Sequence, residues 1–329
     1  MIRSEFITLL GGAAAWPLAG HAQQTERVRR IGWLVPWREQ DAVTQASVNA
    51  FAHALENLGW VEGKNIRIDY RFASGDRALF KTYAAELVNL SPDAILASTP
   101  PAVAALREQT RTIPIVFVFV VDPVGLGFTQ SLARPGGNIT GFGGYDAPMM
   151  GKWLQLLKKV APRVTRVAVI FNPHTAPCAP LFIREIEAAT PSLGMTVTLA
   201  PVRDDAAIEE AVAAQARERG GSLLTLPDSF NAAHRDVIIV AASRRGLPLT
   251  GLIDIFPRDG ALMSYGFDPF DLYAQTASYI DRILNGASPA DLPVQQPSKF
   301  LLVINLKTAR ALGLTVPPSM LDLADEAIE

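Results

Sequence analysis

The residues best suited to chemistry in this chain are polar and aromatic side chains that follow short apolar runs rich in β-branched residues. Such runs are typical of buried parallel strands, and parallel strands end at one edge of their sheet. Hydroxyl, carboxylate, amide and aromatic groups gathered at that edge can hydrogen-bond to a small molecule and stack on it. The candidates for ligand binding are Trp37, Ser98, Thr99, Asp122, Phe142, Tyr145, Asn172, Asp228 and Tyr265.

Each candidate also has a structural interpretation. Thr99 and Asp228 stand where helix N-caps are expected, and Phe142 suits core packing as well as a ligand wall. A ligand carboxylate is expected near the helix that follows Ser98 and Thr99, because the backbone N–H groups of a helix N-terminus are unpaired. The pattern predicts binding and leaves the individual contacts open.

Motifs for catalysis, metal binding and nucleotide binding are missing from the sequence. It contains no G-x-S-x-G elbow, no Walker-type loop and no H-E-x-x-H. Gly125-Leu126-Gly127 begins a dinucleotide fingerprint, but Gln130 occupies the position of the third glycine. The single cysteine, Cys178, excludes a multi-cysteine metal site. We expect no cofactor, no metal and no catalysis, with an α/β enzyme as a remote alternative.

The charge balance argues against nucleic acid as a partner. The chain has 30 Lys and Arg against 32 Asp and Glu, and its only cluster of cations is Arg27, Arg29 and Arg30. Binding to phosphates requires clustered Lys and Arg. We therefore expect no nucleic-acid partner.

Residues 1–22 have the form of a signal peptide. A short apolar stretch, Phe6 to Ala19, follows Arg3, and small residues stand at Gly20 and Ala22 before the expected cleavage point. The stretch is too short for a permanent membrane span, which needs about 20 residues. We expect an exported soluble chain beginning at Gln23. An uncleaved anchor or a buried N-terminal helix is the alternative.

Strands and helices alternate along the rest of the chain, and the alternation restarts halfway. The last apolar run of the first series is Ile113 to Val121, and Arg166 to Phe171 opens the second series. A chain of 329 residues can bury two cores of about 150 residues each. The pattern predicts an α/β fold with two Rossmann-like lobes, each built on a parallel sheet.

The stretch from Asp122 to Tyr145 separates the two series. It holds seven glycines and two prolines in 24 residues, a density that indicates sharp turns or close backbone approach. We expect a short helix at Val124 to Leu132 and a hinge crossing at Asn138 to Gly144. The strands and helices expected in the C-terminal part of the chain are too few for a third domain, so they should return to both lobes. The predicted first lobe holds residues 23–140 and about 252–290, and the second holds 141–251 and about 291–329.

Long strings of the sequence carry a resemblance to a known family. They are SEFITLLGGAAAWPLAGHAQQ, VDPVGLGFTQSLARPGGNITGF, RVAVIFNP, GALMSYG and PADLPVQQPSKFLLVINLKTARALGLTVPPSMLDLADEAIE. Through them the chain resembles the ABC-transporter substrate-binding proteins, a family that contains tryptophan- and tyrosine-binding members.

The resemblance implies a type 1 periplasmic binding fold, with a three-segment hinge and capture of the ligand by closure of the lobes. It implies a monomeric periplasmic receptor that delivers a small molecule, such as an amino acid or another carboxylate, to ABC permease subunits in the inner membrane. The family's ligand positions match at Ser98, Thr99, Asp122 and Tyr265. Arg3 stands alone where such leaders often carry adjacent arginines, so general secretion and twin-arginine export both stay open. A sensory receptor of the same fold is the alternative function.

Overall fold

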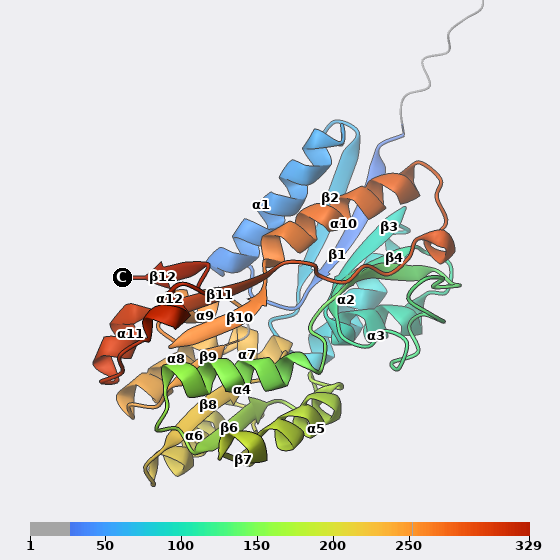
Figure 1. Ribbon diagram of the computed structural model, residues 1–329. Helices are drawn as coiled ribbons and strands as arrows, with labels where there is room; N and C mark the ends of the chain where they lie inside the picture. The colour runs from blue at the N-terminus through green and yellow to red at the C-terminus, as the bar shows by residue number, and fades with distance from the viewer. Residues whose placement is uncertain (1–26, 252) are drawn as a thin grey trace, which may run out of the picture.

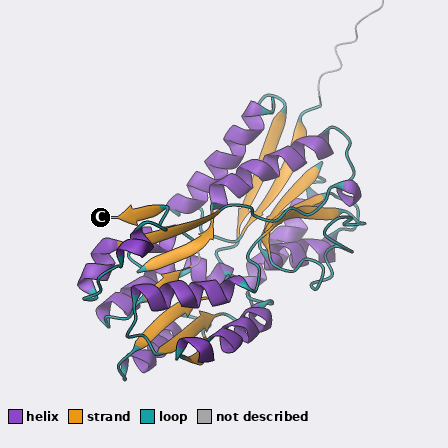
Figure 2. Ribbon diagram, in the orientation of Figure 1, coloured by secondary structure: helices purple, strands orange, loops and turns teal. Residues whose placement is uncertain are grey.

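The computed structural model describes residues 27–251 and 253–329, so the expected signal peptide lies outside the described residues. Two separate sheets, each flanked by helices, divide this part of the chain into two lobes (Figures 1 and 2). The predicted two-lobed α/β fold is confirmed. No helix of the described segments is both long enough and apolar enough to cross a membrane.

The first lobe is built on a five-stranded parallel sheet in the order β2-β1-β3-β4-β5. Helices cover both of its faces, α1 and α10 on one side and α2 and α3 on the other (Figure 1). The strands can therefore be apolar on both faces, as the sequence indicates. The elements are β1 (Arg29–Val35), α1 (Ala42–Asn57), β2 (Ile66–Phe72), α2 (Arg77–Asn89), β3 (Ala94–Ser98), α3 (Pro100–Gln109), β4 (Ile115–Val120), β5 (Ile139–Gly143) and α10 (Pro269–Leu284).

Aspartate caps fix where the helices of this lobe begin. The Asp41 Oδ1 atom accepts a hydrogen bond from Val43 N at 2.8 Å at the start of α1, and Asp76 Oδ1 accepts one from Ala78 N at 2.7 Å at the start of α2. A carboxylate in this position pairs one of the amides that a helix N-terminus leaves unpaired. The cap on α1 places Asp41 just beyond the carboxyl end of β1, at the edge that faces the second lobe.

The second lobe is built on a seven-stranded sheet in the order β12-β11-β10-β9-β8-β6-β7. Neighbouring strands pair in parallel except β10 and β11, so β11 and β12 run opposite to the other five strands. The strands are β6 (Arg166–Phe171), β7 (Thr196–Pro201), β8 (Gly221–Thr225), β9 (Leu249–Gly251), β10 (Met263–Phe267), β11 (Phe300–Asn305) and β12 (Glu326–Ile328). The helices are α4 (Met149–Val160), α5 (Ala179–Ala189), η1 (Pro191–Leu193), α6 (Asp205–Ala216), α7 (Ser229–Ala233), α8 (Arg235–Arg244), α9 (Ile255–Arg258), α11 (Leu306–Ala311) and α12 (Pro318–Leu321), and the short η2 (Pro289–Asp291) precedes the final crossing.

The described chain crosses between the two sheets three times: after β5, between β10 and α10, and between η2 and β11. The third crossing stays attached to the first sheet before it leaves. Gln295 N donates to the Gly141 carbonyl at 3.0 Å, and the Gln295 carbonyl accepts from Gly143 N at 2.7 Å. A three-segment connection of this kind constrains how the lobes can move relative to each other.

The expected assignment of residues 252–290 to the first lobe needs correction. Strand β10 pairs with β9 and β11 in the second sheet, whereas α10 packs against α1 in the first lobe. The return to the first lobe therefore begins near Pro269, after β10. Apolar β-rich runs show that a strand exists, but pairing partners far along the chain decide which sheet it joins.

The glycine-rich stretch also differs from its expected form. Residues 124–132 form turns rather than a helix, and the expected hinge crossing at 138–144 is mainly the edge strand β5. Gly141 has a φ of +152°, and a Cβ built on it would lie 2.1 Å from the Phe117 carbonyl oxygen. A side chain therefore cannot fit at Gly141, because β4 passes too close. Close strand packing explains this glycine, and a hinge does not.

Candidate functional site

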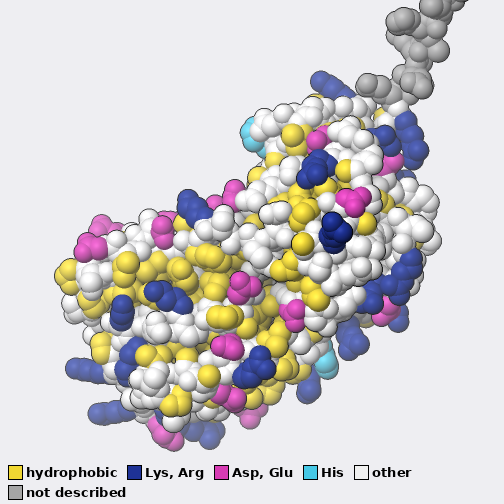
Figure 3. Space-filling view, turned by 45° about the vertical axis from the view of Figure 1, so that its right-hand side comes forward, with side chains coloured by type: hydrophobic (Ala, Val, Ile, Leu, Met, Phe, Trp, Pro, Cys, Tyr) yellow, Lys and Arg dark blue, Asp and Glu magenta, His cyan; other side chains and the backbone are white. Residues whose placement is uncertain are grey.

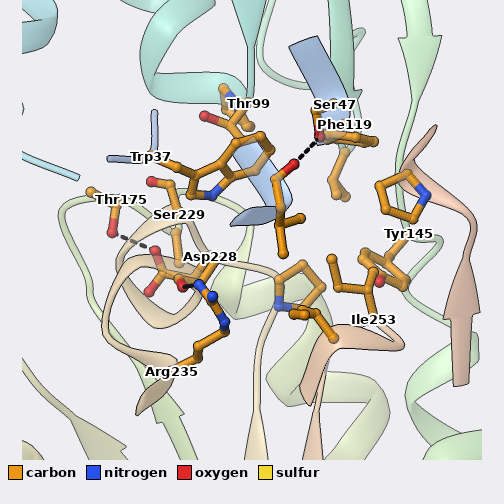
Figure 4. A pocket seen from close by; sticks show the side chains of 18 of the residues that line it. Trp37, Ser47, Thr99, Phe119, Tyr145, Thr175, Asp228, Ser229, Arg235 and Ile253 are labelled. Carbon is orange, nitrogen blue, oxygen red and sulfur yellow. Dashed lines mark hydrogen bonds between the residues drawn. The ribbon is translucent and has the colours of Figure 1, made fainter. Parts of the chain in front are cut away.

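A pocket lies between the two lobes, at the carboxyl ends of the strands of both sheets (Figure 4). It contains about 900 Å³ of space free of protein atoms, including its open mouth. In Figure 4, Trp37, Thr99 and Phe119 of the first lobe face Asp228, Arg235 and Ile253 of the second. The lining residues are Trp37, Asp41, Val43, Thr44, Ser47, Thr99, Pro100, Phe119, Val121, Tyr145, Thr175, Ala176, Pro177, Cys178, Pro227, Asp228, Ser229, Ala232, Arg235, Ile253, Ile255, Phe267 and Pro269.

Aromatic rings form one wall of this cleft pocket. Phe119 stacks on Phe267 with 5.2 Å between ring centroids and an interplanar angle of 15°. The ring centroids of Trp37 and Phe119 lie 5.9 Å apart, and those of Tyr145 and Phe267 lie 4.6 Å apart. Burial raises the pKa of Tyr145 well above its usual value, and the nearby Asp254 charge adds to the effect, so the hydroxyl stays protonated. The wall offers apolar surface and ring faces to a ligand.

Four buried polar atoms of the lining have no hydrogen-bond partner in the part of the chain that the structure describes. They are Trp37 Nε1, Thr44 Oγ1, Thr99 Oγ1 and Ser229 Oγ. The first three belong to the first lobe and Ser229 to the second. Burying a donor or acceptor without a partner costs about 1–3 kcal/mol, so native proteins rarely leave several in one place. A ligand with hydrogen-bonding groups at both lobes would remove that cost.

The Asp228 carboxylate is buried at the pocket wall and is already hydrogen-bonded. It accepts from Asn172 N at 2.6 Å, Thr175 Oγ1 at 2.5 Å and Phe230 N at 2.9 Å. Burial raises its pKa to about 6, although the three donors act in the opposite direction. Asp228 therefore joins the loops that follow β6 and β8 and caps α7. Its position also leaves a negative charge beside the pocket at neutral pH.

An ion pair closes the cleft on the side of α1 and α8. The Arg235 Nη1 atom at the start of α8 lies 2.5 Å from Asp41 Oδ2 of the first lobe, and Arg235 Nε lies 2.8 Å from Asp259 Oδ2 of the second. Burial lowers the pKa of Arg235, but the two carboxylates outweigh it and the net pKa is raised. A second contact between the lobes runs from the Cys178 thiol to the Val121 carbonyl at 3.4 Å. These contacts hold the two lobes together around the pocket.

The N-terminus of α3 offers a ligand fewer amides than the sequence suggests. Pro100 and Pro101 occupy its first two positions and have no N–H group, while Thr99 N donates to the Val118 carbonyl at 2.9 Å. Binding of a ligand carboxylate at this helix end is therefore limited to the backbone amides beyond Pro101, and it stays a prediction. The Thr99 side chain, not the helix backbone, is the group that faces the pocket.

Among the nine candidates from the sequence, Trp37, Thr99, Tyr145 and Asp228 line the pocket. Two others are core residues of the first lobe. Ser98 Oγ accepts from Trp33 Nε1 at 3.1 Å and lies 3.0 Å from Tyr273 Oη, which satisfies it away from the pocket. Phe142 packs on Tyr279 with ring centroids 4.7 Å apart. Both residues lie within strands, Ser98 at the end of β3 and Phe142 in β5, and their side chains point into the core.

The remaining three candidates also lie outside the pocket lining. Asp122 is exposed, and its Oδ1 atom accepts from Gly125 N at 2.8 Å within a turn. Asn172 is buried. Its backbone N–H donates to the Asp228 carboxylate, and its side-chain oxygen accepts from His174 N. Tyr265 lies on β10 and packs against a ring of β11. Its position within the strand, rather than beyond the end, keeps it from the cleft.

Several lining residues were missed by the strand-end rule. Asp41, Thr44 and Ser47 lie at the start of α1, one turn or more beyond β1, and the rule could have found them by extending to the helix that follows. Arg235 lies at the start of α8, after the short α7, too far from β8 for the rule to reach. Phe119 lies within β4, where alternation predicts a core residue.

The described side chains provide no metal site, since no three His, Cys, Asp or Glu groups among them are placed to hold an ion. On the face shown in Figure 3, acidic and basic side chains are interspersed and the atoms of the two lobes meet. The chemistry of the pocket is therefore that of hydrogen bonds, apolar contact and three charged groups, Asp41, Asp228 and Arg235.

Comparison with known proteins adds three findings. A family model described as ABC transporter substrate binding protein matches residues 38–328. A tyrosine-binding protein of Clostridioides difficile (strain R20291) is 26% identical over 265 residues, which cover 80% of this chain and 75% of that protein. A conserved domain protein from Vibrio cholerae O1 biovar El Tor strain N16961 superposes with a TM-score of 0.85 at 30% identity, covering 92% of this chain and all of the other.

Two further solved structures share the fold at lower identity. One, from Streptococcus pneumoniae, holds L-Trp and superposes with a TM-score of 0.84 at 24% identity over 91% of this chain and 99% of that chain. The other is a ligand-free, open substrate binding protein from Clostridium difficile with a TM-score of 0.66 at 24% identity, covering 92% of this chain and 99% of that one.

Proposed function

The chain belongs to the ABC transporter substrate binding protein family, and from that premise we propose that it is the periplasmic receptor of an importer for an amino acid with an apolar or aromatic side chain. Proteins of this family bind a ligand and do not transform it. The proposal therefore concerns which molecule the cleft pocket captures and where it is delivered.

The observation that carries the proposal is the set of unpartnered polar atoms beside the aromatic wall. Trp37 Nε1 can only donate, so the ligand must present at least one acceptor. The hydroxyls of Thr99 and Ser229 can donate or accept, and they lie in opposite lobes. A ligand with a compact polar head and an apolar body satisfies both parts of the pocket, and its polar head is the part that joins the lobes.

The charges of the lining favour a zwitterion. Asp41 and Asp228 supply two carboxylates and Arg235 one guanidinium, so the lining carries a net charge of about −1 at neutral pH. A dicarboxylate would meet net repulsion there, whereas the ammonium group of an amino acid would lie in a negative field. Simple carboxylates without an amino group are accordingly weaker candidates than amino acids.

The relatives support the same class of ligand. The curated relative is named for tyrosine, and one of the similar structures holds L-Trp. At equal identity this chain superposes better on the L-Trp complex than on the ligand-free, open structure. The comparison fits a closed arrangement of the lobes, in agreement with the Asp41–Arg235 ion pair across the cleft.

Export and delivery complete the proposal. The family typically works outside the cytoplasm, and residues 1–22 have the composition of a cleavable leader. We propose that the mature protein is a periplasmic monomer, that the closed form docks on ABC permease subunits, and that closure is a population shift driven by the ligand. No cofactor is part of the proposal.

A thermal-shift screen of the purified mature protein tests the proposal. The panel contains the twenty amino acids, carboxylates without amino groups, and sugars. A ligand at 100 times its Kd should stabilise the protein by about 2.7 kcal/mol. We expect the largest shifts with apolar and aromatic amino acids. A shift with a sugar and none with any amino acid would contradict the proposal.

A matched pair of variants links any binding to the cleft. Thr99→Val and Thr129→Val each remove a buried hydroxyl that lacks a partner, but only Thr99 lines the pocket. Thr99→Val should weaken binding measured by calorimetry, and Thr129→Val should leave it unchanged. Equal effects of the two variants would place the ligand elsewhere.

A further inference from the structure

A bulge in β4 aims one aromatic side chain into the cleft. The pairing of β4 with β5 shifts between Val118, which is opposite Phe142, and Val120, which is opposite Gly143, so Phe119 is the extra residue. A bulge of this kind re-aims a side chain and is common beside binding sites. Phe119 is accordingly only partly buried and lines the pocket.

The packing of β4 shows what the bulge changes. Val116 and Val118 pack on one face of the sheet, and Ile115 and Phe117 on the other. In a regular strand Phe119 would follow Phe117 into the second core, but Val120 takes that place. Because of the bulge, Val120 fills the core position next to Phe117, and Phe119 lies over the carboxyl edge of the sheet.

The backbone at Phe119 is strained. Its φ is +62°, a left-handed conformation that is unusual for a bulky residue. Backbone strain of this kind persists only where the surroundings hold it, and it is concentrated at functional sites. The neighbouring Gly144 permits the arrangement, because a Cβ there would lie 3.2 Å from the Phe119 carbonyl carbon.

Three rings hold Phe119 in one position. Its ring centroid lies 5.1 Å from that of Tyr273, 5.2 Å from Phe267 and 5.9 Å from Trp37. Tyr273 is itself fixed by a contact of 3.0 Å between its hydroxyl and Ser98 Oγ. A ring packed by residues from three separate segments cannot readily swing away to admit a larger ligand.

We propose that Phe119 sets the size limit for the apolar part of the ligand, an inference that rests on the proposed function of the cleft. The ring occupies pocket space that the β-strand alternation would otherwise leave open. It admits a side chain with one ring or an aliphatic chain and excludes a side chain with two fused rings. Phe119 is therefore a specificity-determining residue.

Calorimetric titration of wild type, Phe119→Gly and Phe119→Ala with L-Leu, L-Phe and L-Trp tests the proposal. Glycine fits a φ of +62° without strain, whereas alanine keeps the strain and loses only the ring. We expect wild type to favour L-Phe over L-Trp. Both variants should shift the ratio of the two Kd values toward L-Trp by at least about tenfold. A change in Phe119→Gly alone would assign the effect to the backbone and overturn the proposal.

Controls separate this inference from the proposed function. Phe128→Ala removes a ring outside the cleft lining and should leave the ratio unchanged, while circular dichroism checks the fold of each variant. The same titrations with benzyl alcohol and 2-naphthalenemethanol test ring size without an amino-acid head. Suppose that no amino acid binds wild type, but that Phe119→Gly binds 2-naphthalenemethanol at least tenfold more tightly than wild type does. The proposed ligand class then fails and the size limit holds. An unchanged ratio in both series overturns the size limit.

Discussion

Replacing Asp41 by Asn should weaken ligand binding without weakening the individual lobes. Asparagine is as good an N-cap as aspartate, so the bond from Val43 N and the start of α1 should persist. The change removes the charge that pairs with Arg235 across the cleft. Because the pair forms only when the lobes meet, its loss affects the closed form and leaves the open form as it is.

The magnitude follows from the burial of the pair. The Asp41 and Arg235 side chains are 13% and 17% exposed, so solvent screens them little. A hydrogen bond to a charged group contributes about 1.5–3 kcal/mol. Arg235 keeps Asp259 as a partner in the variant, so no isolated charge is buried and the larger cost of a broken buried pair does not apply. At 1.4 kcal/mol per factor of ten, Kd should rise about tenfold to a hundredfold.

The assay is calorimetry with the best amino acid from the screen, together with small-angle scattering of the free and bound protein. Asp76→Asn is the matched control, since Asp76 caps α2 in the same way and lies outside the cleft lining. Asp41→Asn should raise Kd and shift the free protein toward a more open shape, whereas Asp76→Asn should do neither. A Kd within twofold of wild type for Asp41→Asn, or an equal loss in both variants, would refute the reasoning.

Three further predictions concern other parts of the molecule. The pKa of Asp228 is raised to about 6 from an ordinary value of 3.8, so the folded protein binds this proton more tightly than the unfolded chain does. The resulting stabilisation of the folded protein is complete below about pH 4 and is lost as the pH rises through 6. Urea unfolding at pH 5 and pH 7.5 should therefore show wild type gaining stability relative to Asp228→Asn at the lower pH, and an unchanged difference would contradict this. Gly141→Ala should destabilise the fold by at least about 2 kcal/mol, because its Cβ would overlap the Phe117 backbone, while Gly137→Ala, which meets no atom within 4 Å, should change the unfolding free energy by less than about 0.5 kcal/mol. Trp37→Phe keeps one aromatic ring but removes the unpartnered indole N–H, and it should raise Kd about fivefold in calorimetry while leaving the melting temperature of the free protein nearly unchanged; unaltered affinity would show that the indole does not donate to the ligand.

The candidate site was only partly predictable from the sequence. The rule that ligands lie beyond the carboxyl ends of parallel strands found Trp37 and Thr99, because Thr99 directly follows β3 and Trp37 follows β1 after a single residue. It misplaced Ser98, which is the last residue of β3 and points into the core. Residue type cannot distinguish Ser98 from Thr99, since both side chains carry a hydroxyl. One step along the strand changes the face on which a side chain lies.

The glycine-rich stretch shows the same limit. Its composition correctly indicated close approach of backbone, but the approach is between β4 and β5 rather than at a hinge. A glycine in the sequence indicates that a side chain would not fit at that position. The reason, a neighbouring strand that passes close by, is seen only in the structure. The bulge that places Phe119 in the cleft left no signal that sequence alternation could detect, because IVFVFV reads as an unbroken buried strand.

The sequence by itself determined the α/β class and the division into two lobes. These depend on local pattern: apolar β-rich runs, helical periodicity and caps such as Asp76 act within a few residues of one another. Tertiary structure alone decided that β10 joins the second sheet, that Asp41 meets Arg235 and that Phe119 faces the cleft. Each of these depends on contact between segments distant in the chain, and the free energy of such contacts is not encoded in any one of the segments.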